Sequence, residues 1–154
     1  MKSRNIDFIS EMESIIDKCE VCHLAMVSEN GEPYVLPMNF AYLDQTIFLH
    51  SAPVGKKMGI LEKNNQVCIN FSTDYDLKFV NEEVACSYSM RYKSVLAYGR
   101  VEFIEDLKEK EQILNQVMKK YVHKEDFKYS GPAIRNVKVW KVVTSKMEGR
   151  AYGY

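Results

Sequence analysis

The stretch "VCHLAMVSENGEPYVLPMNFAYLDQTIFLHS", residues 21–51, decides the fold. Residues 21–28 are predicted to form a strand, and residues 33–43 the strand that returns beside it. Asn30-Gly31, in the "ENGE" between them, is typical of a hairpin turn. Residues 45–51 are predicted to form the next strand. This part of the chain is therefore expected to be an antiparallel sheet.

Helices are expected only at intervals around these strands. Apolar residues recur at helical spacing over residues 6–18. A short helix is predicted over residues 55–64. Asp106 and Glu109 have the spacing of a capping box, which starts a further helix. The apolar positions of the first helix are Phe8, Ile9, Met12, Ile15 and Ile16, and those of the last are Leu107, Leu114, Val117, Met118 and Tyr121.

Further strands are predicted downstream of residue 64. Residues 66–71 alternate, with Val67, Ile69 and Phe71 on one face. Residues 84–104 form a long strand or a strand pair, in which Val101 and Phe103 alternate with Arg100 and Glu102. Residues 73–83 are expected to be a loop and residues 136–145 the last strand. Many short antiparallel strands with few helices indicate a mainly β protein, a small closed barrel with peripheral helices.

Composition limits the class of protein. The 154 residues suit a single domain, residues 1–154, with a real core. The charges balance, with 21 basic and 21 acidic residues, so no overall field favours nucleic acid or an anionic membrane. No apolar run approaches the ~20 residues of a membrane span, and the start lacks a signal-peptide core. We expect a cytoplasmic protein with reduced cysteines.

Residues 19–23, "CEVCH", match the C-x-x-C-H motif of covalent haem attachment. That chemistry needs two accessible thiols and a free histidine as axial ligand. Cys22 and His23 fall in a predicted strand, which favours two small apolar cysteines at a helix-to-strand junction. Cys68 and Cys86 are isolated, so no metal site is predicted.

Phosphate binding is a second possibility. The chain contains neither a P-loop nor a G-x-G-x-x-G motif. Gly55, Lys56 and Lys57 open a helix whose dipole already favours anions. Either these lysines are solvated, or they hold a phosphate monoester. Pro37, inside a predicted strand, indicates an edge strand or a backbone left free for a ligand.

Three blocks carry a resemblance to a known family: "PMNF" at residues 37–40, "FLHSAPVGKK" at residues 48–57 and "MRYKSVLAYGRVEF" at residues 90–103. In this order and spacing the chain resembles the flavin-binding split barrels related to pyridoxamine 5′-phosphate oxidase. Within them it is most similar to the nitroimidazole-resistance branch. The resemblance implies a six-stranded antiparallel Greek-key barrel, and a homodimer with one flavin in each of two interface clefts.

The resemblance also implies site residues. Lys56 and Lys57 match the position that holds the flavin phosphate, where the oxidase branch has an arginine followed by a lysine. His50 matches a histidine that lies beside the reaction centre of the related proteins, so it is the candidate catalytic residue. The alternative is a hydrogen-bonded residue that only forms part of the wall of the site. Arg91 is a candidate for binding an anionic substrate, the alternative being a surface or interface arginine. The other matched positions that meet the flavin are Pro37, Met38, Asn39, His50, Ser51, Ala52, Lys93, Ser94 and Val95.

The function implied is that of an FMN-dependent oxidoreductase, with FAD as the alternative cofactor and a nitro-aromatic compound as the small-molecule substrate. The substrate-binding C-terminal block of the oxidases has no match in "KMEGRAYGY", residues 146–154, so pyridoxamine phosphate oxidation is not expected. Two alternatives stay open: a non-catalytic flavin-binding or storage protein, and a haem-binding split barrel.

Overall fold

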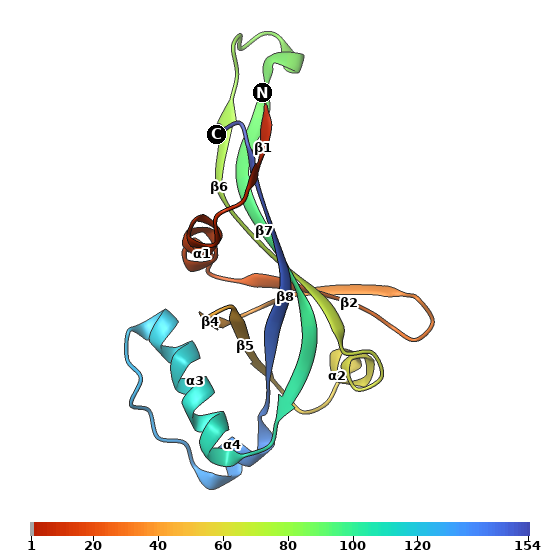
Figure 1. Cartoon of the computed structure of the whole chain (residues 1–154), viewed down its shortest axis with the longest axis vertical. Helices are drawn as coiled ribbons and strands as arrows, with labels where there is room; N and C mark the ends of the chain where they lie inside the picture. The colour runs from red at the N-terminus through yellow and green to blue at the C-terminus, as the bar shows by residue number, and fades with distance from the viewer. Residues whose placement is uncertain (1) are drawn as a thin grey trace.

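Two long strands run through the whole molecule. In the computed structural model, which describes residues 2–154, β7 (Ser89–Ile104) pairs antiparallel with β8 (Lys138–Tyr152). Their register extends from Ile104 opposite Val139 to Tyr92 opposite Tyr152. Figure 1 shows a wider body at one end of this pair and a narrow arm at the other. Body and arm are therefore parts of one continuous sheet.

The body is a split barrel. Its strands follow the order β3-β2-β6-β7-β8-β5-β4, and β1 pairs with the far end of β8. β8 changes partner along its length, because residues 138–143 pair with β5 and residues 149–152 pair with β1. The remaining strands are β1 (Ser3–Ile6), β2 (Cys22–Val27), β3 (Pro33–Met38), β4 (Ala41–Leu43), β5 (Thr46–Ser51) and β6 (Gln66–Lys78).

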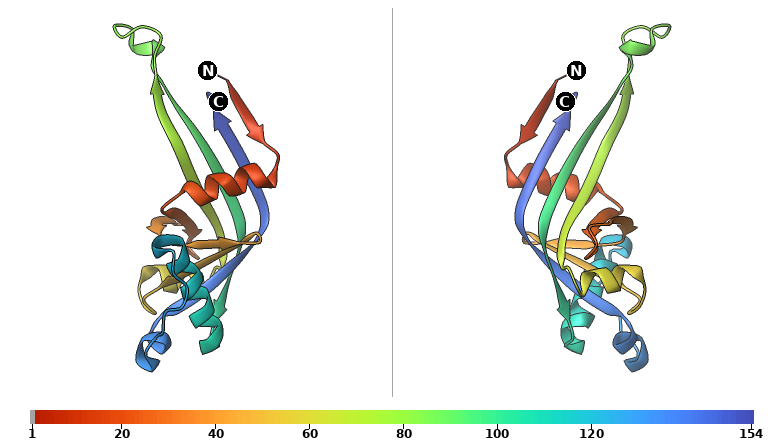
Figure 2. Two further views of the ribbon diagram at one scale, coloured as in Figure 1. Left: turned by 90° about the vertical axis from the view of Figure 1, so that its left-hand side faces the viewer. Right: turned by 90° about the vertical axis from the view of Figure 1, so that its right-hand side faces the viewer.

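The arm is the distal part of β6 and β7. The two strands pair out to Lys78 opposite Ser89, and the loop between them contains a single 3-10 turn, Ala85–Ser87. Figure 2 shows this hairpin projecting beyond the rest of the described chain, with α1 (Ile9–Lys18) crossing its base on one side. β8 ends at Tyr152, so the outermost part of the arm has only two strands.

Four helices surround the sheet within residues 2–154. α1 buries Met12, Ile15 and Ile16 against the barrel core. α3 (Leu107–Val122) begins at its N-cap Asp106, whose carboxylate accepts a 2.8 Å hydrogen bond from the Glu109 amide. α2 (Lys56–Leu61) and α4 (Gly131–Asn136) are short. No helix among these residues is both long and apolar enough to cross a membrane.

The core has two parts. The larger fills the barrel and includes the fully buried side chains of Trp140, Phe40 and Phe71. The smaller lies between α3, α4 and the sheet, and it also holds Lys110, whose ammonium donates to the Val137 carbonyl. At the junction between barrel and arm, a Cβ on Gly99 would lie 2.6 Å from the Val143 carbonyl oxygen. Only glycine fits there, where Ser145 forms a bulge in β8.

The predicted fold class, mainly β with peripheral helices in a split barrel, is confirmed. All six predicted strands are present. Among residues 2–154 the sheet has eight strands because Asn39 and Phe40 divide the predicted strand 33–43 into β3 and β4, and because residues 3–6 add β1. The predicted hairpin also forms. The Ser28 amide donates a 2.9 Å hydrogen bond to the Glu32 carbonyl across the loop, and Gly31 adopts a φ of 78°.

Several boundaries were wrong. The loop predicted at residues 73–83 is a strand as far as Lys78, because its residues continue the antiparallel pairing with β7 after a shift of register between Thr73 and Asp76. The last strand was predicted to end at residue 145, but β8 continues to Tyr152 as the third strand of the arm. The first helix begins at Ile9 rather than residue 6, because residues 3–6 pair with β8. α4 was not predicted.

Cys19 and Cys22 offer a test of the "CEVCH" motif. Both thiols are buried, and burial raises the pKa of Cys22 to about 12. Replacing Cys22 by serine places a hydroxyl in the apolar core, which we expect to lower the free energy of unfolding by about 1–3 kcal/mol. Cys19→Ser is expected to cost less, because its side chain already donates to the Ile15 carbonyl. Urea unfolding measures both.

The visible absorption spectrum of the purified protein is expected to be the same in both variants. Loss of a covalently attached chromophore in either one would contradict a purely structural role for these cysteines.

Candidate functional site

The two lysines at the start of α2 have different surroundings. Gly55, the N-cap, has a φ of 121°, which lets the chain turn sharply after β5. Lys56 is exposed, with its ammonium 3.3 Å from Glu32 and 4.9 Å from the centre of the Tyr34 ring. Lys57 is half-buried, 5.8 Å from the centre of the Trp140 ring. Burial lowers the pKa of Lys57, and no carboxylate among residues 2–154 counteracts this effect.

His50 lies near Lys57, at the end of β5. Its Nδ1 is buried and has no hydrogen-bond partner among residues 2–154, and the same is true of Trp140 Nε1. Burial lowers the pKa of His50, and the charge of Lys57 lowers it further. The imidazole is therefore neutral at pH 7 and has unused hydrogen-bonding capacity.

These residues form what we call the barrel half-site: His50, Lys56, Lys57 and Trp140. A half-buried ammonium without a counter-ion is costly, and an anion placed against it would restore the lost solvation. The N-terminus of α2 adds free backbone N–H groups at the same point. A phosphate monoester fits this arrangement of charge and donors.

The predicted positions on β5 and around β3 are placed as follows. Ser51 and Ala52 follow His50, and the Ser51 hydroxyl donates to the Ala52 carbonyl at 2.8 Å. Pro37 lies on β3, which pairs only with β2 and is an edge of the sheet, as its missing N–H requires. Asn39 is exposed, whereas the Met38 side chain is buried in the core, so only its backbone is free to meet a ligand.

The remaining predicted positions lie on β7, at the base of the arm. Val95 is fully buried, so its side chain contacts only the core. Lys93 shares the Val95 face and lies 3.5 Å from Asp74. Arg91, on the same face, lies 3.5 Å from Asp76, and its guanidinium stacks 3.9 Å from the centre of the Tyr154 ring.

Ser94 points to the opposite face of the arm from Val95. There it lines a hollow of about 670 Å³ whose other walls include Tyr92, Leu96, Glu148 and Arg150. Such a volume is in the range of small-molecule sites. Ser94 faces Arg150 directly across the β7–β8 ladder, and we call this hollow the arm half-site.

The two half-sites are far apart in one chain. His50 is opposite Val139 of β8, whereas Ser94 is opposite Arg150. Eleven residues of strand separate these points, which is a path of at most about 36 Å along β8 at ~3.3 Å per residue. This span is much longer than a flavin mononucleotide. A single chain therefore does not bring all the predicted residues to one ligand.

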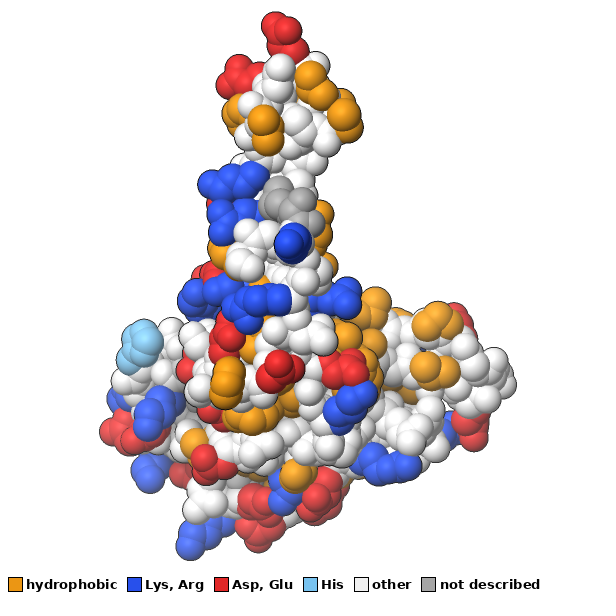
Figure 3. Space-filling model, turned by 45° about the horizontal axis from the view of Figure 1, so that its top comes forward, with side chains coloured by type: hydrophobic (Ala, Val, Ile, Leu, Met, Phe, Trp, Pro, Cys, Tyr) orange, Lys and Arg blue, Asp and Glu red, His pale blue; other side chains and the backbone are white. Residues whose placement is uncertain are grey.

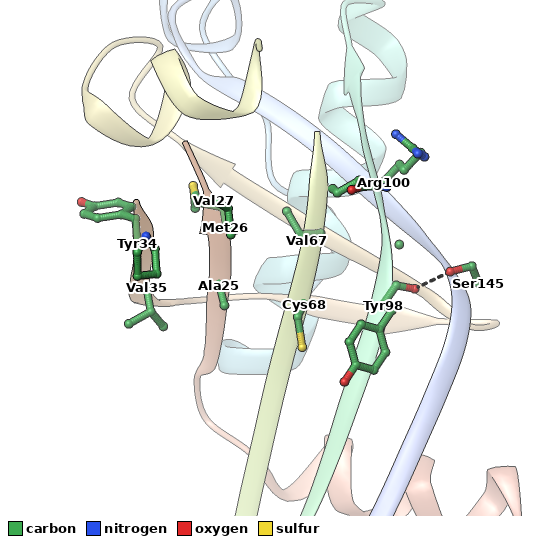
Figure 4. Close-up of a pocket in the computed structure, with 13 residues that line it drawn as sticks. Ala25, Met26, Val27, Tyr34, Val35, Val67, Cys68, Tyr98, Arg100 and Ser145 are labelled. Carbon is green, nitrogen blue, oxygen red and sulfur yellow. Dashed lines mark hydrogen bonds between the residues drawn. The ribbon is translucent and has the colours of Figure 1, made fainter. Parts of the chain in front are cut away.

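A further hollow, of about 630 Å³, lies on the outer face of the sheet and contains none of the predicted residues. Figure 4 shows one row across four strands there: Val35, Ala25, Cys68 and Tyr98. Beside it, the Ser145 hydroxyl donates to the Tyr98 carbonyl. Burial raises the pKa of the Cys68 thiol, which does not favour a reactive cysteine.

Sequence reasoning missed Arg150, Trp140 and Tyr34. Trp140 and Tyr34 contact the two lysines only because distant strands meet in the barrel, and no local pattern signals this. Alternation along β8 places Arg150 on the Ser94 face, but the strand was predicted to end before it. Within residues 2–154, no group of three or more potential metal ligands is close enough to hold an ion.

Comparisons with known proteins agree with this architecture. The sequence profile described as "Pyridoxamine 5'-phosphate oxidase" matches residues 9–151. A crystal structure from Bacteroides thetaiotaomicron, of a protein assigned to 5-nitroimidazole antibiotic resistance, is 45% identical and has a TM-score of 0.87. It is aligned over 97% of this chain and 87% of its own. Among proteins with curated descriptions, none matches the chain.

More distant structures share the fold. The flavocytochrome Anf3 from Azotobacter vinelandii is 19% identical with a TM-score of 0.82, covering 99% of this chain and 70% of its own. A FAD-binding protein from Mesorhizobium loti is 22% identical with a TM-score of 0.70, covering 99% of this chain and all of its own. The split barrel is thus a fold in which flavin-binding proteins occur.

The half-buried His50 makes the stability of the protein depend on pH. Its pKa is lower in the folded state than the ~6.5 of an unfolded chain, so the unfolded state binds more protons between these two values. Stability is therefore expected to fall as the pH decreases from about 6.5. His50→Asn removes the titrating group, so the variant should lose less stability between pH 7.5 and pH 5 than the wild type.

Urea unfolding at the two pH values measures this difference. Equal losses in wild type and His50→Asn would contradict the burial of a neutral imidazole.

Proposed function

Because the chain belongs to the pyridoxamine 5′-phosphate oxidase family, in its nitroimidazole-resistance branch, we propose that it is an FMN-dependent oxidoreductase. In this proposal it is a cytoplasmic homodimer that binds one flavin in each of two clefts between the chains and reduces nitro-aromatic compounds. Its four free cysteines fit a reducing compartment.

The observation that carries the proposal is the unpaired ammonium of Lys57 beside the unpartnered Nδ1 of His50. Neither group has a partner among residues 2–154, and a flavin mononucleotide would supply one to each of them. The phosphate would lie between Lys57 and the N-terminus of α2, with Lys56 as a second, more exposed contact. A charge-assisted hydrogen bond there is worth about 1.5–3 kcal/mol.

The distance between the half-sites supports the dimer. A flavin held by the barrel half-site of one chain can meet Ser94 only if that residue comes from a second chain. A twofold axis would then create two equivalent clefts, each formed by the barrel half-site of one copy and the arm half-site of the other. The arm half-site offers the Ser94 hydroxyl and the Arg150 guanidinium to the part of the flavin far from its phosphate.

The bound flavin would supply the electron or hydride transfer. The chain's own residues would position it and shape the reaction. His50 is held neutral, so at pH 7 it can donate or accept a hydrogen bond without adding charge beside the ring. Arg91, already stacked on Tyr154, is the candidate contact for an anionic group of the substrate, and it lies on the opposite face of the arm from Ser94.

A nitro-aromatic substrate is favoured over pyridoxamine phosphate by two observations. The relative from Bacteroides thetaiotaomicron, at 45% identity, is the one assigned to nitroimidazole resistance. In addition, residues 146–154 contain one arginine and no histidine, and they have no match to the arginine- and histidine-rich substrate block of the oxidases.

The proposal is tested by purifying the protein and identifying its chromophore. We expect a flavin spectrum, with FMN released on denaturation, bleaching by NAD(P)H without oxygen and recovery of colour on addition of a nitroimidazole. Bound flavin that no reductant bleaches would indicate storage rather than catalysis. A Soret band without flavin would contradict the proposal.

The two lysines give a quantitative prediction. Lys57→Ala is expected to weaken FMN binding by about 1.5–3 kcal/mol. Lys56→Ala should have a smaller effect, because Lys56 is exposed and already paired with Glu32. Riboflavin, which lacks the phosphate, should bind weakly and be little affected by either change. Fluorescence titration of the apoprotein measures all of these affinities.

Lys57→Gln is the matched control, because it keeps most of the side-chain length and removes the charge. Equal FMN affinities for wild type and Lys57→Ala would place the phosphate elsewhere, and parallel losses for FMN and riboflavin would indicate general destabilisation.

A further inference from the structure

The edge strand β3 connects the helix start proposed to hold the phosphate with a second, polar region. At the start of β3, the Lys56 ammonium lies 3.3 Å from Glu32 and 4.9 Å from the centre of the Tyr34 ring. At its other end, β3 is followed by the exposed Asn39. The five residues from Tyr34 to Asn39 span at most about 17 Å at ~3.3 Å per residue. This is about the length of a flavin mononucleotide, so a flavin laid along β3 from its phosphate would bring its ring close to Asn39.

A hollow of about 380 Å³ lies beside Asn39, and we call it the Asn39 hollow. Its other walls come from the last turn of α1, the segment that leads into β2 and the last turn of α3. These elements are far apart in the sequence and meet only in the folded chain. Apart from Asn39 itself, none of the residues that line the hollow has a role in the proposed flavin site.

Tyr121 fixes the shape of the Asn39 hollow. Its hydroxyl donates to the Glu20 carbonyl at 2.6 Å and accepts from the Phe40 amide at 3.1 Å. These two hydrogen bonds join the end of α3 to the segment before β2 and to the bend between β3 and β4. The walls of the hollow are therefore held in place without a ligand.

Lys120 lies on the wall of the Asn39 hollow and has hydrogen-bonding capacity to spare. It is half-buried, and its ammonium donates to the Asp17 carbonyl at 3.2 Å and lies 4.5 Å from the centre of the Phe40 ring. Neither contact carries a negative charge, and an ammonium has three N–H donors. Burial lowers the pKa of Lys120, and the Asp17 carboxylate acts in the opposite direction. A ligand that accepts a hydrogen bond from this ammonium would restore part of its lost solvation.

The other charges on the wall favour a neutral ligand group. The hollow is also lined by Asp17, Glu20 and Lys18, and Lys18 is paired with Asp74 at 2.9 Å. A carboxylate or phosphate in the hollow would meet two acidic side chains as well as the Lys120 ammonium. A nitro group carries no net charge, so it avoids this repulsion, and its oxygens can still accept from the ammonium.

The cations at the base of the arm are less suited to hold a nitro group. Figure 3 shows Lys and Arg side chains gathered on the narrow part of the molecule. Arg91 there lies 3.5 Å from Asp76, and Lys93 lies 3.5 Å from Asp74. Both cations also face the Tyr154 ring, at 3.9 and 5.0 Å from its centre. Their charges are thus matched within the chain.

We propose that the Asn39 hollow receives the nitro group of the substrate and that the Lys120 ammonium donates a hydrogen bond to one of its oxygens. This inference rests on the proposed function, because a flavin along β3 is what places the reacting ring next to the hollow. Reduction of a nitro group to a nitroso group takes up two electrons and two protons and releases water. NAD(P)H supplies the electrons and one proton as hydride, and solvent supplies the other proton.

Lys120 then acts on the reaction as well as on binding. Negative charge develops on the nitro oxygens as the group is reduced. A fixed cation beside them stabilises this charge more than it stabilises the neutral ground state, which raises kcat. The inference therefore predicts a larger effect of Lys120 on turnover than on affinity.

Two compounds that differ only in the nitro group test the Asn39 hollow. Lys120→Met should weaken binding of 4-nitrobenzyl alcohol to the FMN-loaded protein about 10-fold, and it should change binding of benzyl alcohol less than about twofold. The kcat for reduction of the nitro compound should fall by more than its affinity. Lys120→Arg keeps the charge and should retain most of both. Isothermal titration calorimetry gives the affinities, and steady-state kinetics gives kcat.

Lys119→Met is the matched control. It removes the same charge from the neighbouring position of α3, where Lys119 is exposed and pairs with Glu125 at 2.7 Å. Lys120→Gln is the second variant if Lys120→Met does not fold, because it removes the charge and keeps an N–H donor. Circular dichroism shows which variants are folded.

Equal affinities of wild type and Lys120→Met for 4-nitrobenzyl alcohol would overturn the inference. Parallel losses for the two alcohols would also overturn it, because they indicate altered packing. Fluorescence titration with FMN separates this inference from the proposed function. A protein that cannot be loaded with FMN, but binds the nitro compound through Lys120, would contradict the function and leave the hollow standing. Flavin-dependent reduction that is equally fast with and without Lys120 would leave the function standing and overturn the inference.

Discussion

The continuous pairing of β7 with β8 is the constraint on which the rest of the structure depends. Thirteen paired positions tie the barrel to the arm as one sheet. A sheet of this length has little freedom to fold back on itself, so residues attached to its two ends stay apart. The separation of His50 and Ser94 along the strand pair is the reason that the proposed flavin site needs two chains.

The two half-sites are incomplete in complementary ways. The barrel half-site has a half-buried Lys57 without a counter-ion and a buried imidazole nitrogen without a partner. The arm half-site has an open hollow lined by the Ser94 hydroxyl, the Arg150 guanidinium and the Tyr92 ring. Buried polar groups without partners are uncommon, and their concentration near a helix start is typical of binding sites. One ligand held between two chains would satisfy both.

Much of the barrel could be predicted because its signals are local. Alternation along residues 66–71, the Asn30-Gly31 turn and the Asp106 cap each depend on residues a few positions apart, and each was confirmed. The arm could not be predicted in this way. Residues 73–78 alternate out of phase with the rest of β6 because the register shifts between Thr73 and Asp76, and this hid the strand.

The candidate site shows the same limit. Lys56 and Lys57 were found from the helix start, and His50 from the end of a strand. Their difference in burial, and the contact of Lys57 with Trp140, depend on strands that are distant in sequence. Val95 was predicted to meet the flavin, but only the structure shows that its side chain is in the core, and that Ser94 and Arg150 share the opposite face.

The most direct test of the central claim, that each flavin site is formed by two chains, is a mixing experiment. Lys57→Ala damages the barrel half-site, and Ser94→Trp fills the arm half-site. Each variant alone should bind flavin poorly. After equal amounts are unfolded and refolded together, half of the dimers should be mixed and each should hold one intact site. Flavin should then occupy about a quarter of the sites. If the mixture contains dimers but binds no flavin, the claim is contradicted and the site lies within a single chain.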